Sequence, residues 1–153
     1  MSRTLRRSIQ PVLICCVVAS VLTLSCRSSP ALDPKNELPF GWIDAPVQGA
    51  TVAPDSALRV IGWALDDSSV KEVRVYLDNH FSAKASFAIA RADLVPLYPN
   101  YVHNSNTHGW RADIRTPASP GVHTLMAQAT DDAGATHDLT VVSITVRGDA
   151  ARP

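Results

Sequence analysis

After about residue 40, apolar and polar residues alternate along much of the chain, with the two-residue period of strands that bury one face. The clearest case is residues 70–77, where one set of alternate side chains is apolar and the other polar: Val73, Val75 and Leu77 against Glu72, Arg74 and Tyr76. The same reasoning predicts strands at residues 40–44, 57–65, 81–90, 110–114, 122–130 and 139–146. Long helical periodicity is absent from this region, so we expect an all-β domain.

Turn-forming residues separate these strands at short spacing. Asp78 and Asn79 follow the clearest strand, and both tolerate the unusual backbone angles of a tight turn. Acidic and glycine-containing turns follow residues 57–65 and 122–130 in the same way. About seven strands in a segment of this length fit an immunoglobulin-like two-sheet antiparallel sandwich. A β-barrel is the alternative architecture.

The first residues have the three-part layout of an export signal. Basic residues begin it, an apolar stretch covers residues 11–24, and the small Ser25 precedes Cys26. A cysteine at this place resembles the bacterial lipobox, which implies loss of residues 1–25 and membrane attachment through acylated Cys26. Two alternatives are secretory cleavage that leaves a soluble protein, and an uncleaved anchor. The apolar stretch is short for an anchor, because a spanning helix needs ~20 residues.

The rest of the chain divides by composition into a Pro/Ser-containing tether at residues 26–39, a sandwich domain at 40–147 and a C-terminal tail at 148–153. Arg27 follows Cys26, whereas Asp there would resemble a signal for retention in an inner membrane. We therefore expect an exported lipoprotein at the outer membrane or cell surface. The other cysteines, Cys15 and Cys16, would leave with the signal, so the domain would contain no disulfide.

Charge argues against a nucleic-acid partner. The chain balances 14 basic against 14 acidic residues, and loss of the arginines in the signal would leave the exported part weakly acidic. It has no basic stripe, whereas binding to a phosphate backbone requires clustered Lys and Arg. We expect its partners to be membrane lipid, through acylated Cys26, and an unknown protein or glycan.

Short motifs after residue 40 are similar in order and spacing to bacterial Ig-like domains of exported and surface proteins. The matching stretches are residues 43–46 with Gly49 and Val52, residues 60–66, residues 73–78, and residues 121–125 leading into 129–131. Residues 91–93 followed by Tyr98 and Pro99 resemble an insert of one subset of these domains. Asn79 stands where the family often has Gly, and His123 where Tyr or His packs at a strand corner. The family implies adhesion, spacing or recognition, without shared catalytic residues.

Two acidic turns raise the question of a calcium site. In a sandwich of this type Asp66 and Asp67 lie at the same end as Asp131 and Asp132. Calcium takes six to eight oxygen ligands, several of them carboxylate. We favour the alternative that these residues only form turns, because the sequence contains no spaced calcium-loop motif. We therefore expect no metal and no cofactor.

No catalytic constellation emerges from the sequence. No serine lies in a Gly-x-Ser-x-Gly motif, and the expected domain lacks cysteine. A zinc site needs three or four converging ligands, and the histidines show no such grouping: His80, His103, His108, His123 and His137. We expect surface or packing roles for them, and a protein that is not an enzyme.

The long connection at residues 91–109 is the candidate binding segment. Connections of this length are uncommon and often functional. Its candidate residues combine apolar area with hydrogen-bonding groups: Leu97, Tyr98, Tyr101, His103 and His108. The alternative, which we favour, is that Leu and Tyr fold back over one sheet as a lid.

Two function classes remain, namely a non-catalytic lipoprotein that binds a protein or spaces the envelope, and a carbohydrate-binding module. A sugar site requires a flat, exposed aromatic platform, whereas a protein contact uses a sheet edge or a mixed apolar patch. Trp42, Trp63 and Trp110 each lie in an expected strand, where packing is the usual role. Their exposure therefore distinguishes the two classes.

Overall fold

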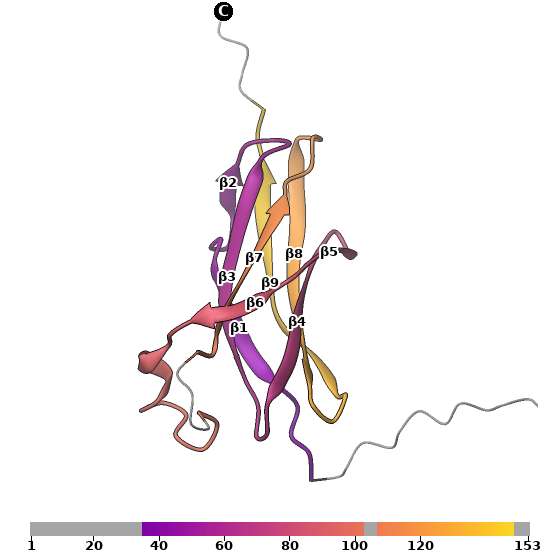
Figure 1. Ribbon diagram of the computed structural model, residues 1–153. Coiled ribbons are helices and arrows are strands. Elements are labelled where there is room, and N and C mark those ends of the chain that lie inside the picture. Colours follow the sequence, from indigo (N-terminus) through magenta and orange to yellow (C-terminus); the bar gives the residue numbers. More distant parts are fainter. Residues whose placement is uncertain (1–34, 103–106, 149–153) are drawn as a thin grey trace, which may run out of the picture. The chain divides into compact units, whose positions relative to one another are not determined.

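The structure, a computed structural model, describes residues 35–102 and 107–148 (Figure 1). The expected signal with Cys26, most of the expected tether, candidate residue His103 and most of the C-terminal tail lie outside the described residues. The described part of the chain forms two β-sheets with one 3-10 turn, which confirms the all-β sandwich.

A four-stranded sheet has the order β1-β3-β7-β6 and a five-stranded sheet the order β2-β9-β8-β4-β5 (Figure 1). The strands are β1 (Phe40–Ala45), β2 (Ala50–Val52), β3 (Ala57–Leu65), β4 (Val70–Leu77), β5 (His80–Lys84), β6 (Ser86–Ile89), β7 (Gly109–Arg115), β8 (Gly121–Asp131) and β9 (Thr136–Val146). All neighbours are antiparallel except β2 and β9. This is the strand order of an immunoglobulin-type sandwich in which the first strand divides between the two sheets.

The strand expected at residues 81–90 is in fact two strands in different sheets. β5 pairs with β4, whereas β6 pairs with β7. Between them, Ala85 is buried in the core and its N–H donates to the carbonyl of Val73 at 2.9 Å. The small side chain lets the backbone cross from one sheet to the other. Alternation cannot reveal such a crossing, because the period stays the same while the neighbour changes.

The core lies between the sheets and is centred on Trp110, which is fully buried. The same buried cluster contains Val60 and Ala64 of β3 from one sheet, and Val73 and Val75 of β4 from the other. Gly62 lies directly against the Trp110 ring, so closely that a Cβ atom at residue 62 would clash with it. A glycine in mid-strand is therefore the counterpart of this large core side chain.

The Asp78–Asn79 turn joins β4 to β5 with φ angles of 50° and 64°, as the sequence predicted. The Asp78 carboxylate accepts hydrogen bonds from the Thr124 N–H at 2.9 Å and from His123 Nδ1 at 2.7 Å. His123 Nε2 lies 3.0 Å from the carbonyl of Ser119. Since both ring nitrogens face acceptors, the protonated imidazole fits best, and the hydrogen bond to Asp78 raises the pKa of His123. His123 thus packs at a strand corner, as its resemblance to the family implied.

Candidate functional site

A loop of residues 90–102, here called the covering loop, folds over the outer face of the four-stranded sheet. It begins with the 3-10 turn η1 (Ala92–Leu94) and continues through turns in which the Tyr98 N–H donates to the Leu94 carbonyl at 2.8 Å. Leu94 is 2% exposed, so the loop has an apolar contact of its own beneath it. The expected short turn near Ala92 is confirmed.

Four rings join the covering loop to the ends of β1 and β3, and we call them the aromatic cluster: Phe40, Trp63, Tyr98 and Tyr101. The Phe40 ring centroid lies 5.3 Å from that of Tyr98 and 5.0 Å from that of Tyr101, both edge-to-face. The Trp63 centroid lies 5.5 Å from that of Tyr98. These separations are those of favourable aromatic pairs. The rings therefore hold the loop against the sheet.

Arg91 adds a second connection at the start of the covering loop. Its guanidinium contacts Asp44 of β1 at 2.7 Å and Asp93 at 2.8 Å. Its Cζ atom also lies 6.0 Å from the centre of the Trp63 ring, a cation–π distance. The hydrogen bond from Arg91 lowers the pKa of Asp93, and the same bond raises the pKa of Arg91. This side chain therefore ties the loop to two strands at once.

The expected binding residues of the loop divide between packing and exposure. Tyr98 and Tyr101 are half-buried in the aromatic cluster. The Tyr101 hydroxyl donates to Glu37 Oε2 at 2.6 Å, which raises the pKa of Tyr101. Leu97 is 67% exposed, and His108 lines a pocket described below. The structure therefore favours a lid role for both tyrosines, and a binding role for Leu97 and His108 stays a prediction.

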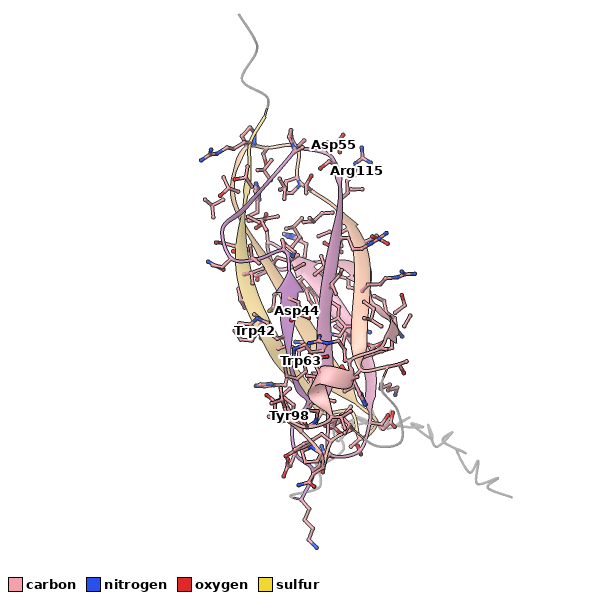
Figure 2. All side chains as sticks on the ribbon, turned by 90° about the vertical axis from the view of Figure 1, so that its left-hand side faces the viewer. Trp42, Asp44, Asp55, Trp63, Tyr98 and Arg115 are labelled. Carbon is pink, nitrogen blue, oxygen red and sulfur yellow. The ribbon has the colours of Figure 1, made fainter. Side chains whose placement is uncertain are left out.

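The three tryptophans differ in exposure. Trp110 is in the core and Trp63 is in the aromatic cluster, whereas Trp42 of β1 is 55% exposed. Figure 2 shows Trp42, Asp44, Trp63 and Tyr98 gathered in the same part of the molecule. A sugar site could use only Trp42 among these three as an open aromatic surface.

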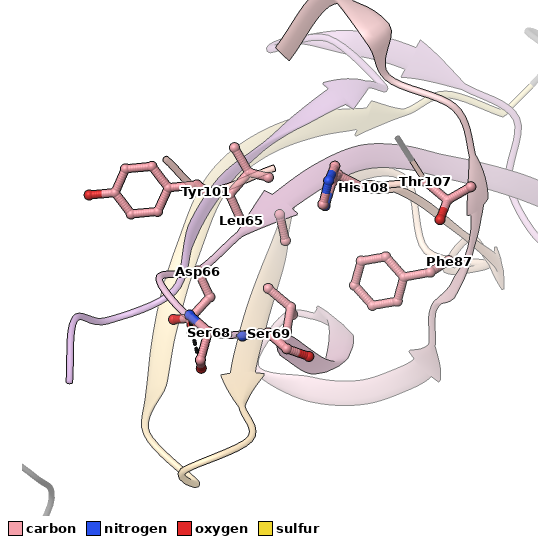
Figure 3. A pocket seen from close by; sticks show the side chains of 10 residues that line it. Leu65, Asp66, Ser68, Ser69, Phe87, Tyr101, Thr107 and His108 are labelled. Atoms are coloured by element: carbon pink, nitrogen blue, oxygen red, sulfur yellow. Dashed lines mark hydrogen bonds between the residues drawn. The ribbon is translucent and has the colours of Figure 1, made fainter. Parts of the chain in front are cut away.

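A pocket of about 260 Å³ lies near the ends of β3 and β4 (Figure 3). Leu65, Val70 and Phe87 contribute apolar walls, and Asp66 and His108 contribute polar groups. One oxygen of the buried Asp66 carboxylate accepts three hydrogen bonds from the turn that follows, whereas its Oδ1 atom makes none. Burial raises the pKa of Asp66. The carboxylate thus serves first to shape its own turn.

The acidic turns lie at one end of the sandwich, as expected, because the Asp132 N–H donates to the Ser69 carbonyl at 3.1 Å. The Asp131 carboxylate accepts from the Ala135 N–H and from Asn36 Nδ2, each at 2.7 Å. Asp131, like Asp66, is thus engaged by groups close to its turn. The described residues include no group of three or more His, Cys, Asp or Glu placed to hold a metal ion.

Three histidine rings of the described segments contact nearby groups, and two of these rings, those of His80 and His123, both contact Asp78. The ring of His80 contacts its own turn, that of His137 contacts the Pro39 carbonyl, and that of His123 contacts Asp78. Each of these rings has a local structural partner. Within the described residues they belong to no group of three or more possible ligands, the number that a zinc site requires.

The outer face of the five-stranded sheet carries a feature that sequence reasoning missed. Its strands place four apolar side chains side by side, here called the apolar row: Val141 of β9, Met126 of β8, Tyr76 of β4 and Phe81 of β5. Val141 is 56% and Phe81 58% exposed, while the two residues between them are half-buried. The ring centroids of Tyr76 and Phe81 lie 6.1 Å apart. The row therefore crosses the sheet without a covering segment among the described residues.

A polar row runs beside it, formed by Asp138, Gln128, Arg74 and Lys84 in the same strand order. Gln128 donates to Asp138 at 2.8 Å. At the other side of the sheet, Glu72 contacts both Arg74 at 2.6 Å and Lys84 at 2.9 Å. The face is therefore acidic on β9 and has a basic excess on β4 and β5.

Comparison with protein families decides the classification. Residues 39–141 match the model described as "Bacterial Ig domain". The chain belongs to the bacterial Ig domain family. This match covers most of the described strands and agrees with the strand order of the two sheets. A search of curated proteins found no match.

The structure of a set of fibronectin(III)-like modules agrees with this family at the level of the fold. The fibronectin(III)-like modules of Clostridium thermocellum CbhA share 15% identity, with a TM-score of 0.53 over 76% of this chain and 50% of that chain. This bacterial Ig domain thus spans about half the length of that structure. CopC from Methylosinus trichosporium OB3b shares 12% identity over 75% of this chain and 99% of that chain, with a TM-score of 0.41. In the described segments no helix has the length and hydropathy to cross a bilayer.

Proposed function

We propose that this protein is a non-catalytic, exported surface lipoprotein whose Ig domain binds another protein. The observation that carries the recognition role is the exposed apolar row on the five-stranded sheet. Large apolar side chains that lie side by side and are rimmed by charged residues are typical of protein contact surfaces. The expected adhesion or spacing role is a consequence of such a contact between a membrane-held domain and its partner.

Membrane attachment is the second part of the proposal and rests on the resemblance of residues 22–26 to a lipobox. Acylated Cys26 would hold the domain at the outer membrane or cell surface through the tether of residues 26–39. A lipid-attached chain should incorporate a palmitate analogue in the cell and sediment with membranes. The Cys26→Ser variant should lose both properties. Equal labelling of this variant would contradict the attachment.

The recognition role is tested by capturing envelope proteins with the purified chain. A double change of Phe81→Ser and Val141→Ser should abolish capture of the specific partner, because it removes both exposed ends of the apolar row. Trp42→Ala is the matched control, since Trp42 is comparably exposed on the other sheet. Capture that is lost with the control and kept with the double variant would refute this face as the site.

Carbohydrate binding is the second candidate, and the exposure of Trp42 is the observation that favours it. Asp44, two residues further along β1, is a polar neighbour that is held by Arg91. A sugar ring stacked on Trp42 should quench its fluorescence, and Trp42→Ala should remove the response. No response to envelope glycans would remove this candidate.

A further inference from the structure

The exposed face of the five-stranded sheet carries opposite charges at the two sides of its polar row. Asp138 lies at the β9 side of the polar row and Lys84 at the β5 side, with Gln128 and Arg74 between them. Arg74 and Lys84 share the single carboxylate of Glu72, so that side of the sheet keeps a positive excess. Asp138 accepts a hydrogen bond from the neutral Gln128 amide.

Two bulges place the apolar row and the polar row on the same face. In β9 the register shifts beside Ala127 and Gln128, which brings Asp138 to the same side as Val141. In β5 a second shift brings Lys84 to the same side as Phe81. The Arg74 guanidinium lies 6.0 Å from the centre of the Phe81 ring, which confirms that both rows face one way. β-Bulges commonly re-aim side chains in this manner.

A two-fold axis that runs along the strands, between β8 and β4, makes this face complementary to itself. The rotation sets β9 of one copy over β5 of the other. Asp138 then faces Lys84 of the second copy, and Val141 faces Phe81. Packed sheets keep their strands within about 30° of parallel, so an axis along the strands suits face-to-face contact. This rotation sets no two like charges of the polar row opposite one another.

We propose that the occupant of this face is a second copy of the chain, which forms a symmetric dimer through the apolar row. The inference rests on the proposed function, because it names the partner of the same surface. Four strands spaced about 4.8 Å apart and about nine residues long give roughly 600 Å² per copy, or about 1,200 Å² in total. That area is at the lower limit for a stable interface, so we expect a dissociation constant in the micromolar range.

The symmetry also fits attachment to one membrane. An axis along the strands leaves both copies pointing the same way, so the described chain starts, at Lys35, lie at the same end of the pair. That end carries the contact between Asn36 and Asp131. Two lipid-held chains on one surface could therefore meet through this face without reversing direction.

Sedimentation of the exported chain in mild detergent tests the proposal across the micromolar range. The wild-type chain should pass from monomer to dimer as its concentration rises. Asp138→Lys and Lys84→Asp should each weaken self-association at least about tenfold, because each sets like charges opposite one another. Phe81→Ser should do the same by removing apolar contact.

The decisive step of this experiment is to mix the Asp138→Lys and Lys84→Asp variants. In a mixed pair both charge contacts become attractive again, so the mixture should dimerise although neither variant does so alone. This rescue also shows that both variants are folded. Asp113→Lys is the matched control, since Asp113 is an exposed carboxylate paired with Arg59 on the other sheet, and it should dimerise like the wild type.

A chain that stays monomeric throughout, or a dimer that all these changes leave intact, would overturn the proposal. Absence of rescue in the mixture would overturn the geometry on which it rests. If the chain is monomeric while Phe81→Ser still abolishes capture of an envelope protein, the proposed function stands and the second copy is excluded.

Discussion

The two outer faces of the sandwich both carry large apolar side chains, but within the described residues a loop covers such side chains on one face only, and there Trp42 stays exposed. On the four-stranded sheet, Trp63 and Phe40 lie beneath Tyr98 and Tyr101 of the covering loop. On the five-stranded sheet, Phe81 and Val141 are more than half exposed. The comparison teaches that aromatic content does not locate a binding surface. What matters is whether the same chain supplies a segment that buries the aromatic residues.

The largest expected effect comes from removing the ring on which the covering loop rests. Trp63→Ala should lower the free energy of unfolding by about 2–3 kcal/mol, less than for a fully buried tryptophan because Trp63 is half-buried. Urea denaturation provides the measurement. A loss below about 0.5 kcal/mol would mean that the loop is not held as a lid.

Arg91→Met should have an intermediate effect of about 1 kcal/mol. The change keeps the apolar stem but removes the ion pairs with Asp44 and Asp93 and the contact with Trp63. The loop should then exchange its amide hydrogens faster while the strands keep theirs. Hydrogen exchange measured by mass spectrometry separates these regions, and unchanged loop exchange would contradict the role assigned to Arg91.

The corresponding changes on the exposed outer face of the five-stranded sheet should hardly affect stability. Phe81→Ser and Val141→Ser, measured singly on monomeric protein, should each alter the free energy of unfolding by about 0.5 kcal/mol or less, as is usual for exposed positions. The same urea denaturation used for Trp63→Ala provides a direct comparison. A loss comparable to that of Trp63→Ala would abolish the contrast between the two faces.

The smallest effect concerns the pH dependence of stability at the His123–Asp78 contact. The pKa of His123 is raised above its ordinary 6.5, so its contribution is complete below that pH and is lost as pH rises through the folded-state pKa. The pKa of Asp78 is lowered below 3.8, so its contribution is lost as pH falls below that range. The melting temperature of the wild type should exceed that of His123→Asn most between these values. A difference that grows above pH 8 would reverse the assigned sign.

Sequence patterns predicted the sheets better than the surfaces. Alternation located β3 and β4 with the bounds that the structure has, because long strands with one buried face repeat the pattern several times. It missed β2, which has three residues, and it joined β5 to β6 across Ala85. Both errors arise because alternation describes a strand alone, without the neighbour with which it pairs.

The candidate binding residues likewise could be predicted only where a single segment of the chain carries the signal. Tyr98 and Tyr101 lie in a connection whose unusual length is visible in the sequence. Their packing agrees with the favoured interpretation of this connection as a lid. The apolar row could not be predicted, because Tyr76 and Phe81 become neighbours of Met126 and Val141 only through cross-strand register. Such information lies in the pairing of the strands and not in any single segment.

Hydroxyl-radical footprinting at two protein concentrations tests the contrast of the two faces most directly. Phe81 and Met126 should be modified readily in dilute protein and become protected as concentration rises into the micromolar range. Trp63 and Tyr98 should be modified weakly at both concentrations, since the chain itself covers them. Strong modification of Tyr98, or modification of Phe81 that does not change with concentration, would contradict the account.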